Sequence, residues 1–544
     1  MKKTVSILSV LLTLALLAFV LTACFDPKTA STTTGGKAKS SAEGTVTTAE
    51  IEALAKESDV TVDTGGATKI LLNGSAATVN GSGAKADGST VTVTAGGTYE
   101  ISGTLSDGRI VVDAEGADVT LVLNNANITC SSSSAIFVYQ AKSATLYLTQ
   151  GTSNTLSDGS SYTYSDSYSS KADEEPNACL YAKDDLIIAG SGSLTVNGNF
   201  NNGITGKDTL KIESTALTVK AKNHGVNGKD SLTLKKATVS VTAAGDALRA
   251  SNDTDTALGY VVIADSTVTL ESGEDGIQAE TRVSIGGTTL TVKSGGGHEA
   301  ADSSSKNSAK GVKAGAELNI DSGVYSFDCA DDALHADGSL TVTGGEFTIT
   351  TADDGLHADN TVTVNAGKLN ITGHEGIEST VVKINDGAIV INASDDGINA
   401  AKKTDGVTPT VEINGGEITV NMGQGDTDGI DSNGHIVING GTVNVNAQSP
   451  FDYDGTGTIN GGKVTVNGTQ VTTLTNQFGG GQGGRNGERG QRGQRGQSGQ
   501  TPPDGQTPPD GQTSQDGQTQ NGDRSSKSGK TRHKKTETTT AATA

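Results

Sequence analysis

Hydrophobic and polar residues alternate in short runs along most of this chain, from about residue 68 to residue 475. Runs such as Val91–Thr94, Tyr99–Ser102 and Val119–Leu123 have a period of two, and turns rich in Gly, Asn and Asp separate them. Alternation of this kind predicts short β-strands that bury one face. The pattern therefore predicts an all-β fold built from many short strands.

A short phrase returns through the second half of this region: an acidic or amide residue, Gly or Ala, an aliphatic residue, any residue, and a small residue. Most of its Gly or Ala positions are 21 or 22 residues apart, with occasional longer steps. A fixed period with longer steps indicates a stacked repeat that carries loop insertions. The clearest copies begin at Asn202, His224, Asp246, Asp275, Lys310, Asp332, Asp354, Glu375, Asp396 and Asp428.

One repeat, Gly355–Glu375, shows how the strands combine. Its aliphatic positions are Leu356, Val362, Val364, Leu369 and Ile371. They predict three short strands per turn with inward side chains, which is typical of a right-handed parallel β-helix with coils of about 21–22 residues. A left-handed helix would show hexapeptides, and the calcium-binding roll would show its nonapeptide motif. No coil can bury its apolar face alone, so stacking is obligatory.

A set of Asn residues occupies one turn of successive repeats. Stacked amides can donate hydrogen bonds from coil to coil. We therefore expect a ladder formed by Asn365, Asn385, Asn414, Asn439 and Asn460.

The first 24 residues have the features of a targeting signal: Lys2 and Lys3, an apolar run, and Leu-Thr-Ala-Cys ending at Cys24. The last four residues match a lipoprotein cleavage box, in which the thiol of Cys24 is lipidated. Two acyl chains there would anchor the protein to the membrane, and we expect it at the extracellular face of the bacterial cell membrane. An ordinary secretory signal with a coincidental Cys is the alternative.

Shifts in composition predict the boundaries of the segments that follow the signal. Residues 25–67 are predicted to be a flexible tether with one short helical pattern near Ala49–Lys56, and residues 68–475 the β-helix. The Ser-rich segment 151–177 is predicted to be a surface insertion. Residues 476–544 have too few apolar residues to fold, so they are a spacer or a wall-associated tail.

The net charge of −22 argues against nucleic acid as a partner and is compatible with divalent cations. The three cysteines after Cys24 form no disulfide framework, and no catalytic thiol is indicated.

Acidic residues at the repeat turn form the strongest candidate site. Neighbouring coils lie about 4.8 Å apart, and two carboxylates at that distance repel by roughly 3.5 kcal/mol at a dielectric constant near 20. Ca²⁺ relieves this repulsion, because its oxygen ligands lie about 2.4 Å away in a flexible geometry. Alternatively, these side chains only cap turn amides. The predicted Ca²⁺ ligands are Asp246, Asp275, Asp331, Asp332, Asp353, Asp354, Glu375, Asp395, Asp396 and Asp428.

The N-terminal strands and the Asp-Asp-Gly turns together resemble a known family. The motifs that carry the resemblance are Gly97–Gly103, Asp107-Gly108, Val119–Asn124, Ser134–Ile136 and Gly151–Asn154, followed by the repeats. The chain is similar over about residues 68–475 to the bacterial carbohydrate-binding β-helix family, whose members are often lipoproteins. The resemblance implies a Ca²⁺-containing β-helix related in shape to pectate lyases, which binds cellulosic and acidic plant polysaccharides without established catalysis. It supplies no ligand-contacting residues.

Three functions remain open at this point. The first is a surface-anchored polysaccharide-binding protein, in which Tyr162, Tyr164 and Tyr168 stack on sugar rings, unless they belong to a disordered flap. The second is a Ca²⁺-dependent lyase, which needs a basic residue such as Lys310, Lys313 or Arg249 beside the ion. The third is an adhesin or spacer with no glycan activity.

Overall fold

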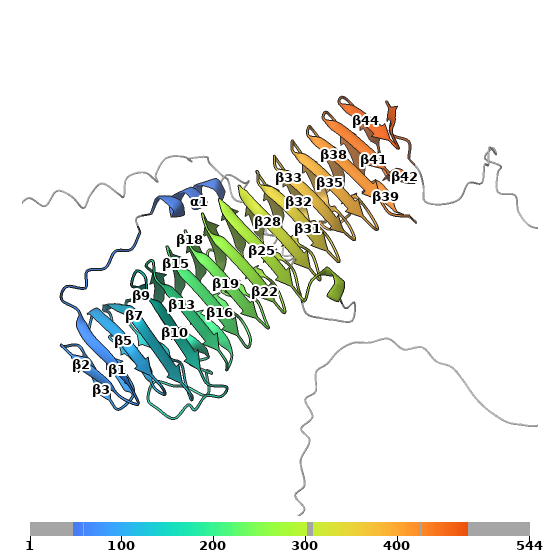
Figure 1. The fold of residues 1–544 in the computed structure, drawn as a ribbon. Coiled ribbons are helices and arrows are strands. Elements are labelled where there is room, and N and C mark those ends of the chain that lie inside the picture. Colours follow the sequence, from blue (N-terminus) through green and yellow to red (C-terminus); the bar gives the residue numbers. More distant parts are fainter. Residues whose placement is uncertain (1–46, 58, 302–307, 425–426, 477–544) are drawn as a thin grey trace, which may run out of the picture. The chain divides into compact units, whose positions relative to one another are not determined.

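The computed structural model describes residues 47–476 except 58, 302–307 and 425–426. All of these residues belong to one compact unit. Its chain winds through strand-built coils that stack along one axis, as the sequence of colours from blue to orange shows (Figure 1). Each coil contributes a strand to three parallel ladders, which confirms the parallel β-helix that the repeat predicts.

The first ladder contains the strands that follow the repeat turn. Register is kept from coil to coil; for example, Leu334 pairs with Leu356 and Leu356 with Ile377. Its strands are β4 (Thr90–Val93), β6 (Arg109–Asp113), β8 (Ile136–Gln140), β11 (Ala178–Ala182), β14 (Asn202–Gly206), β17 (Val226–Gly228), β20 (Leu248–Ala250), β23 (Ile277–Ala279), β26 (Val312–Ala314), β29 (Leu334–Ala336), β32 (Leu356–Val364), β34 (Ile377–Ile384), β36 (Ile398–Ala400), β39 (Asp428–Ser432) and β42 (Ser449–Tyr453).

The second ladder follows directly, and β32 and β34 run through the bend to belong to both. Its other strands are β1 (Thr68–Gly74), β5 (Gly97–Leu105), β7 (Asp118–Cys130), β9 (Ser143–Leu148), β12 (Asp185–Ala189), β15 (Thr209–Glu213), β18 (Ser231–Lys235), β21 (Tyr260–Ala264), β24 (Arg282–Gly286), β27 (Glu317–Ile320), β30 (Ser339–Val342), β37 (Thr410–Ile413), β40 (His435–Ile438) and β43 (Gly457–Ile459).

The third ladder has the most regular alternation of buried and exposed positions, such as the pattern of Thr238–Ala243. Its strands are β10 (Ser153–Asp158), β13 (Ser193–Gly198), β16 (Ala216–Ala221), β19 (Thr238–Ala243), β22 (Thr267–Ser272), β25 (Thr288–Ser294), β28 (Gly323–Cys329), β31 (Glu346–Thr351), β33 (Lys368–Gly373), β35 (Ala388–Ala393), β38 (Glu417–Met422), β41 (Thr442–Asn446) and β44 (Lys463–Val466). The second half of β7 also belongs to this ladder, because Asn127–Cys130 pairs with Thr155–Asp158 of β10.

Antiparallel strands cover both ends of the stack. At the start, β2 (Ala77–Asn80) pairs with β1 and β3 (Ala84–Asp87) pairs with β4. At the other end, β45 (Thr469–Val471) folds back on β44. Terminal coils of a repeat protein need such caps, because an open strand edge invites pairing with another chain.

The interior is one continuous column of aliphatic side chains, as predicted. Val, Ile, Leu and Ala dominate it, and the aliphatic positions of the coil at residues 355–375 are all buried. Cys130, Cys179 and Cys329 are free and buried. Burial raises the pKa of the Cys329 thiol to about 12, so this sulfur is not a nucleophile near neutral pH.

The predicted amide ladder is present. Each Asn donates Nδ2–H to the Oδ1 of the preceding one, at 2.8 Å for Asn385 to Asn365, 2.9 Å for Asn414 to Asn385, and 2.8 Å for the last two steps through Asn439 and Asn460. A second ladder, from Asn446 through Asn421 to Asn392, lies on the third sheet.

The helix α1 (Thr47–Lys56) confirms the short helical pattern, but the segment that contains it does not behave as a free tether. Ile51 and Leu54 are one helical turn apart and pack on Val262 and Ala264 of β21. The side chain of Lys235 is fully buried beneath the segment and lies 3.2 Å from Asp59 Oδ1. The tether can therefore extend no further than about residue 46, and most of it lies outside the described residues, as do Cys24 and the tail. In the part of the chain that the structure describes, no helix has the length and apolar character needed to cross a membrane.

The surface insertion begins later than predicted. Ser153–Asp158 is strand β10, which pairs in parallel with β7 and β13 and so belongs to a coil. Alternation of Asn154, Leu156 and Asp158 toward the interior explains why this segment is part of the sheet. The insertion consequently runs from about residue 159 to residue 177.

Candidate functional site

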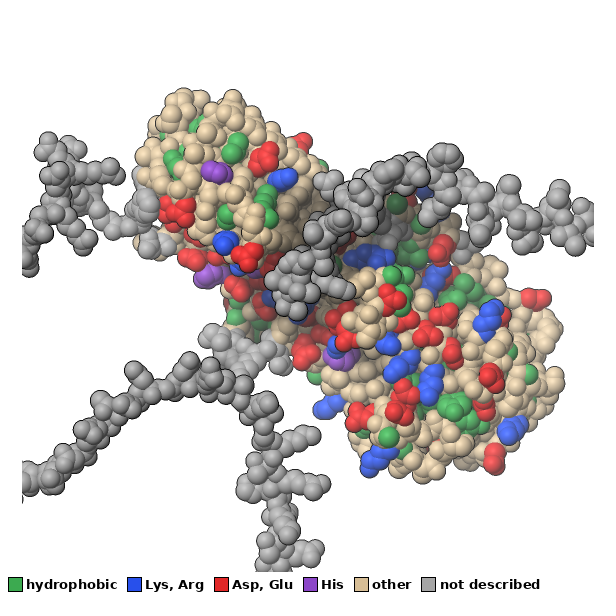
Figure 2. All heavy atoms as spheres, turned by 180° about the vertical axis from the view of Figure 1, so that it is seen from behind, with side chains coloured by type: hydrophobic (Ala, Val, Ile, Leu, Met, Phe, Trp, Pro, Cys, Tyr) green, Lys and Arg blue, Asp and Glu red, His purple; other side chains and the backbone are tan. Residues whose placement is uncertain are grey.

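The repeat turn places acidic side chains above one another on successive coils, in what we call the acidic column. Only Gly or Ala follows the acidic residue in the coils from Asp246 to Asp428, because there is little room: a Cβ atom on Gly355 would lie 2.4 Å from Ile371 Cγ2 and 2.6 Å from the Gly376 oxygen. The close approach of backbone to core at this point keeps the preceding side chain at the same place in each coil. In the space-filling view, acidic side chains lie among Lys, Arg and His side chains over the middle of the body (Figure 2).

One oxygen of several column carboxylates caps the next coil. The backbone N–H of Asp275 donates to Asp246 Oδ1, that of Asp354 to Asp332 Oδ1, and that of Asp428 to Asp396 Oδ1, each at 3.1 Å. The capping alternative is therefore correct for one oxygen. The second oxygen is the one that needs a cation.

In the N-terminal section of the column, from Asp246 to Asp354, the protein itself supplies a cation to most carboxylates; Asp275 has hydrogen bonds only, and Asp353 has no ion pair among the described residues. Asp246 Oδ2 lies 3.2 Å from His224 Nδ1 and 3.4 Å from Arg249 Nη1. Lys310 Nζ lies 2.7 Å from Asp331 Oδ1 and 2.6 Å from Asp332 Oδ2.

Two stacked histidines continue this pattern. His335 Nδ1 lies 2.8 Å from Asp332 Oδ2, and His357 Nδ1 lies 2.6 Å from Asp354 Oδ2 and 3.1 Å from Glu378 Oε2. Their ring centroids are 4.7 Å apart. Burial acts to lower the pKa of His357, but the hydrogen bonds with Asp354 and Glu378 outweigh it and raise the pKa to about 10. His357 is therefore a cation at neutral pH.

At Lys310, too, burial and the neighbouring carboxylates act on the pKa in opposite directions. Burial opposes its charge, yet Asp332 and Asp331 outweigh burial and raise the pKa of Lys310 above its ordinary value. Burial also acts to raise the pKa of Asp332, but His335 and Lys310 hold it well below its usual range. A lysine held protonated in this way cannot accept a proton, so Lys310 is unsuited to be the general base of a lyase.

The C-terminal section, from Glu375 to Asp452, has fewer such partners: Lys403 Nζ lies 2.7 Å from Glu378 Oε2, and His374 Nδ1 lies 4.0 Å from Asp395 Oδ2. Among the ion pairs between described residues, none reaches Glu375, Asp396, Asp431 or Asp452, although Asn399 Nδ2–H donates to Glu375 Oε2 at 3.2 Å. Asp431 and Asp452 are register partners on adjacent strands, about 4.8 Å apart. Glu375, Asp396, Asp431 and Asp452 are therefore the carboxyl groups of this section that have no ion pair among the described residues.

The pKa values of three carboxyl groups in this section are raised. Burial, followed by the charges of neighbouring carboxylates, raises the pKa of Glu375 to about 9, that of Asp431 to about 7 and that of Asp396 to about 6. Protonation is one way to relieve the repulsion, and a bound divalent cation is the other.

The predicted ligands fall into separate groups whose ligand atoms lie within 4.8 Å of one another. Asp331, Asp332 and Asp353 form an all-carboxylate group, but Lys310 already bridges two of them. Glu375 and Asp395 come together with His374, and Asp354 with His357 and Glu378. Asp246 joins His224 and Glu274, whereas Asp275 accepts hydrogen bonds from Ser308 and Lys310. Ca²⁺ prefers oxygen ligands; among the described residues, the one C-terminal group offers two carboxylates and a histidine, and Asp396 and Asp428 belong to no group.

The sequence prediction missed a second line of side chains beside the acidic column. It consists of the fourth residue of the repeat phrase, the position that the repeat leaves open, on the outward face of the first ladder. From coil to coil it reads Arg249, Gln278, Lys313, His335, His357, Glu378, Asn399, Asp431 and Asp452. Strand alternation from the aliphatic position would have identified it.

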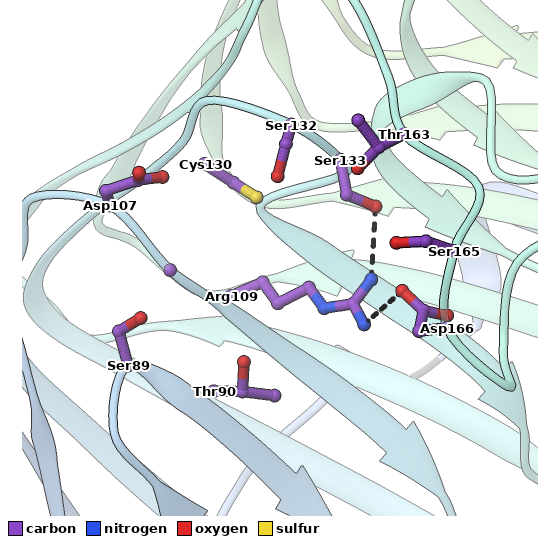
Figure 3. Close-up of a pocket in the computed structure, with 11 residues that line it drawn as sticks. Ser89, Thr90, Asp107, Arg109, Cys130, Ser132, Ser133, Thr163, Ser165 and Asp166 are labelled. Carbon is purple, nitrogen blue, oxygen red and sulfur yellow. Dashed lines mark hydrogen bonds and ion pairs between the residues drawn. The ribbon is translucent and has the colours of Figure 1, made fainter.

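The insertion is held against the coils by ion pairs. Glu175 lies 2.9 Å from Lys183 Nζ and 3.0 Å from Lys207 Nζ. Arg109 Nη2–H donates to Asp166 Oδ2 at 2.6 Å and Nη1–H to Ser133 Oγ at 3.1 Å. Figure 3 shows this pair at one side of a hydroxyl-rich pocket of about 260 Å³. Because the Arg109 guanidinium is already paired with Asp166, we infer that the residues around this pocket fasten the insertion to the coils.

The three tyrosines named as sugar contacts all lie in the insertion and have internal partners. The Tyr162 hydroxyl lies 2.7 Å from Asp158 Oδ2, and the Tyr164 hydroxyl donates to the Pro176 oxygen at 3.3 Å. The Tyr168 ring packs edge-on against Tyr139 with centroids 5.2 Å apart. The flap is thus a packed part of the structure, and direct sugar contact by these tyrosines stays a prediction.

The fold and the column define a solenoid whose stacked turns concentrate carboxylates. The chain belongs to the carbohydrate-binding domain-containing protein family, whose model matches residues 87–355 and 353–477. A carbohydrate-binding domain-containing protein of Acetivibrio thermocellus is 42% identical over 132 residues, which are 24% of this chain and 45% of that protein. The match thus spans less than half of that relative.

One solved structure is also similar, the polysaccharide lyase-like protein from C. thermocellum as a gadolinium derivative. It is 33% identical, and the match covers 47% of this chain and 96% of that chain with a TM-score of 0.43.

Proposed function

We propose that this protein binds a cellulosic or acidic plant polysaccharide at the bacterial cell surface, through a β-helix whose C-terminal section holds Ca²⁺. Membership of the carbohydrate-binding family supports the ligand class. Two observations carry the calcium proposal: Glu375, Asp396 and Asp431 are partly buried carboxyl groups without an ion pair among the described residues, and Glu375 and Asp395 bring oxygens within 4.8 Å of one another.

The ligands proposed for the ion are Glu375, Asp395, Asp396 and Asp431. A bound Ca²⁺ would neutralise the column and offer a positive centre to a uronate carboxylate. The residues of this section do the positioning: Gly376 and Gly397 let adjacent turns approach closely, and Asn399 orients Glu375.

The anchor is proposed from the sequence alone. Lipidation of Cys24 would place the β-helix on the outer face of the membrane. Replacement of the nucleophilic thiol, Cys24→Ser, should shift the full chain from the detergent phase to the aqueous phase in a Triton X-114 partition. A variant that still partitions into detergent would refute lipid anchoring at this residue.

The binding test is a pull-down of the full chain on microcrystalline cellulose and on insoluble polygalacturonate, in Ca²⁺ and in EDTA. We expect retention on at least one of them, and weaker retention in EDTA. The double variant Glu375→Gln/Asp431→Asn should lose the calcium effect, whereas Asp454→Asn, an exposed carboxylate outside the column, should keep it. Absence of binding to both polysaccharides would favour an adhesin or spacer instead.

Two of the three candidate bases of the lyase alternative are engaged. Lys310 is ion-paired and Arg249 lies against Asp246, so neither is available to remove a proton. Lys313, the third, lies on β26 beside the column, and the assay decides whether it acts. Incubation of the protein with polygalacturonate and Ca²⁺ should give no rise in the absorbance of unsaturated products. A sustained rise would overturn the assignment as a binding protein.

A further inference from the structure

A groove of about 530 Å³ lies beside the insertion, where β13, β16 and β19 end. Its walls include Ser160 at the start of the insertion, the Asn199–Phe200 turn, and Lys220, Lys222 and Thr242. The volume falls within the roughly 300–1,000 Å³ that ligand pockets usually have. The groove is separate from the acidic column, and the sequence prediction did not include it.

Phe200 gives the groove an aromatic wall. Every other Phe that the structure describes, namely Phe137, Phe327, Phe347 and Phe451, is buried, whereas Phe200 is partly exposed. The ring stacks on Tyr162 with centroids 4.2 Å apart and planes 17° apart. Tyr162 therefore supports the ring from one side.

A buried carboxylate fixes this arrangement. Asp158 is 3% exposed; its Oδ1 accepts the Asn199 N–H at 2.5 Å and its Oδ2 lies 2.7 Å from the Tyr162 hydroxyl. Asn199 Nδ2–H also donates to the Asp158 oxygen at 2.8 Å. The turn that presents Phe200 and the tyrosine beneath it are thus held by the same residue.

Two ammonium groups form another wall. Lys183, Lys207 and Lys211 nearby are each in ion pairs, but no acidic side chain among the described residues pairs with Lys220 or Lys222. The register explains this for Lys220, because its neighbours on the adjacent strands are Asn197 and Thr242, which are uncharged. In a chain of net charge −22, two such cations at one groove mark a place for an anion.

We propose that this groove binds a uronate residue of an acidic polysaccharide, with the C–H face of the sugar ring on Phe200 and its carboxylate beside Lys220 and Lys222. Aromatic rings bury flat apolar surfaces, and ammonium groups attract carboxylates. The polar walls formed by Asn199, Ser160 and Thr242 can accept or donate hydrogen bonds to ring hydroxyls. This inference rests on the proposed polysaccharide binding and names its site and the charge of its ligand.

The test is calorimetric titration of the full chain with hexagalacturonate and, separately, with cellohexaose. The double variant Lys220→Gln/Lys222→Gln should bind hexagalacturonate roughly tenfold more weakly, since two exposed charge pairs are lost. Phe200→Ala should weaken binding about as much through the lost ring contact. Lys383→Gln/Lys463→Gln, which removes two exposed lysines elsewhere, is the matched control and should bind like the unmodified chain.

The same variants are compared in the polygalacturonate pull-down, which separates the two proposals. If the unmodified chain is retained but the Lys220/Lys222 variant binds hexagalacturonate with unchanged affinity, the groove assignment is wrong and polysaccharide binding stands. If the unmodified chain binds no polysaccharide, both proposals fail. Equal weakening for cellohexaose in the lysine variant would also overturn the assignment, because charge would then not select the ligand. The lysine variants change only exposed side chains, so they keep the test valid if Phe200→Ala does not fold.

Discussion

The two sections of the acidic column have the same turn geometry and deal with repulsion in different ways. In the N-terminal section, Arg249, Lys310, His335 and His357 lie within hydrogen-bond or ion-pair distance of the carboxylates. In the C-terminal section, Glu375, Asp396 and Asp431 have no such partner among the described residues. Their pKa values are raised, as are those of Asp275, Asp353 and Asp354, so the difference between the sections lies in the ion pairs.

The difference has a consequence for how each section responds to its surroundings. A protein cation is present whenever the chain is folded, so the N-terminal section is stable without ions. A bound ion depends on its concentration, so the C-terminal section should respond to calcium and to pH. The following four experiments test this contrast, from the largest expected effect to the smallest.

Removal of the lysine that bridges the N-terminal section should have the largest effect. Lys310→Met leaves Asp331 and Asp332 without their cation, and loss of one partner of a buried ion pair costs about 3–5 kcal/mol. Denaturant unfolding in EDTA would measure this loss. Because Asp331, Asp332 and Asp353 would then form a free all-carboxylate group, added Ca²⁺ should restore part of it. Lys368→Met, which breaks an exposed pair with Glu346, should change stability by no more than about 1 kcal/mol. Equal stability of Lys310→Met and the unmodified chain in EDTA would refute the bridging role.

Calcium itself should stabilise the unmodified chain. At a Ca²⁺ concentration about 100 times the dissociation constant, binding to the folded state adds about 2.7 kcal/mol per site. Asp431→Asn should raise the melting temperature in EDTA and reduce the gain on adding calcium, because it removes both a repelling charge and a ligand. Asp454→Asn should do neither. A calcium gain that Asp431→Asn leaves intact would place the ion elsewhere.

In EDTA, the stability that three carboxyl groups of the C-terminal section contribute should change with pH in the opposite direction to that contributed by an ordinary ion-paired carboxylate. The folded-state pKa values of about 9 for Glu375, about 7 for Asp431 and about 6 for Asp396 lie above those of an unfolded chain. These three groups therefore bind more protons in the folded chain, so the stability that they contribute is fully present below pH about 4 and is lost as pH rises toward about 9. Asp332, whose pKa is lowered, contributes with the opposite sign at the acid end. Melting curves between these limits would check this. Saturating Ca²⁺ should reduce the fall, whereas the part due to His357, whose pKa is also raised, should remain. Stability that rises with pH in EDTA would contradict the account.

The amide ladder should contribute least. Asn414→Ala removes two hydrogen bonds, one to Asn385 and one from Asn439, at a net cost of about 0.5–1.5 kcal/mol. Asn370→Ala, an exposed Asn outside the ladder, serves as the control in the same unfolding experiment. If the two variants unfold alike, the ladder has no role in stability.

Much of the fold followed from the sequence, because strand alternation and the repeat period act locally. The inward positions of the coil at residues 355–375 and the partners of Asn414 both follow from a shared register. The start of the insertion was misplaced because Ser153–Asp158 carries polar residues at inward positions, where Asn154 and Asp158 bond to neighbouring turns. The docking of α1 depends on the apolar patch of Val262 and Ala264, far away in sequence.

The candidate site was predictable only in part. Stacking of the acidic turns follows from the period, but the identity of each counter-ion does not. Lys310 reaches Asp331 and Asp332 from the preceding coil, after a long insertion, and His357 lies on a strand whose outward position the repeat leaves open. The Phe200 groove needs Asp158, Tyr162 and Lys220 from three different segments, which no local pattern connects.

The most direct test of the contrast is a crystal of the full chain grown in Ca²⁺, with anomalous diffraction recorded at a wavelength where calcium scatters. The account predicts a peak among Glu375, Asp395, Asp396 and Asp431, and Lys310 still between Asp331 and Asp332. A map with no peak in the C-terminal section, or with a peak that has displaced Lys310, would contradict it.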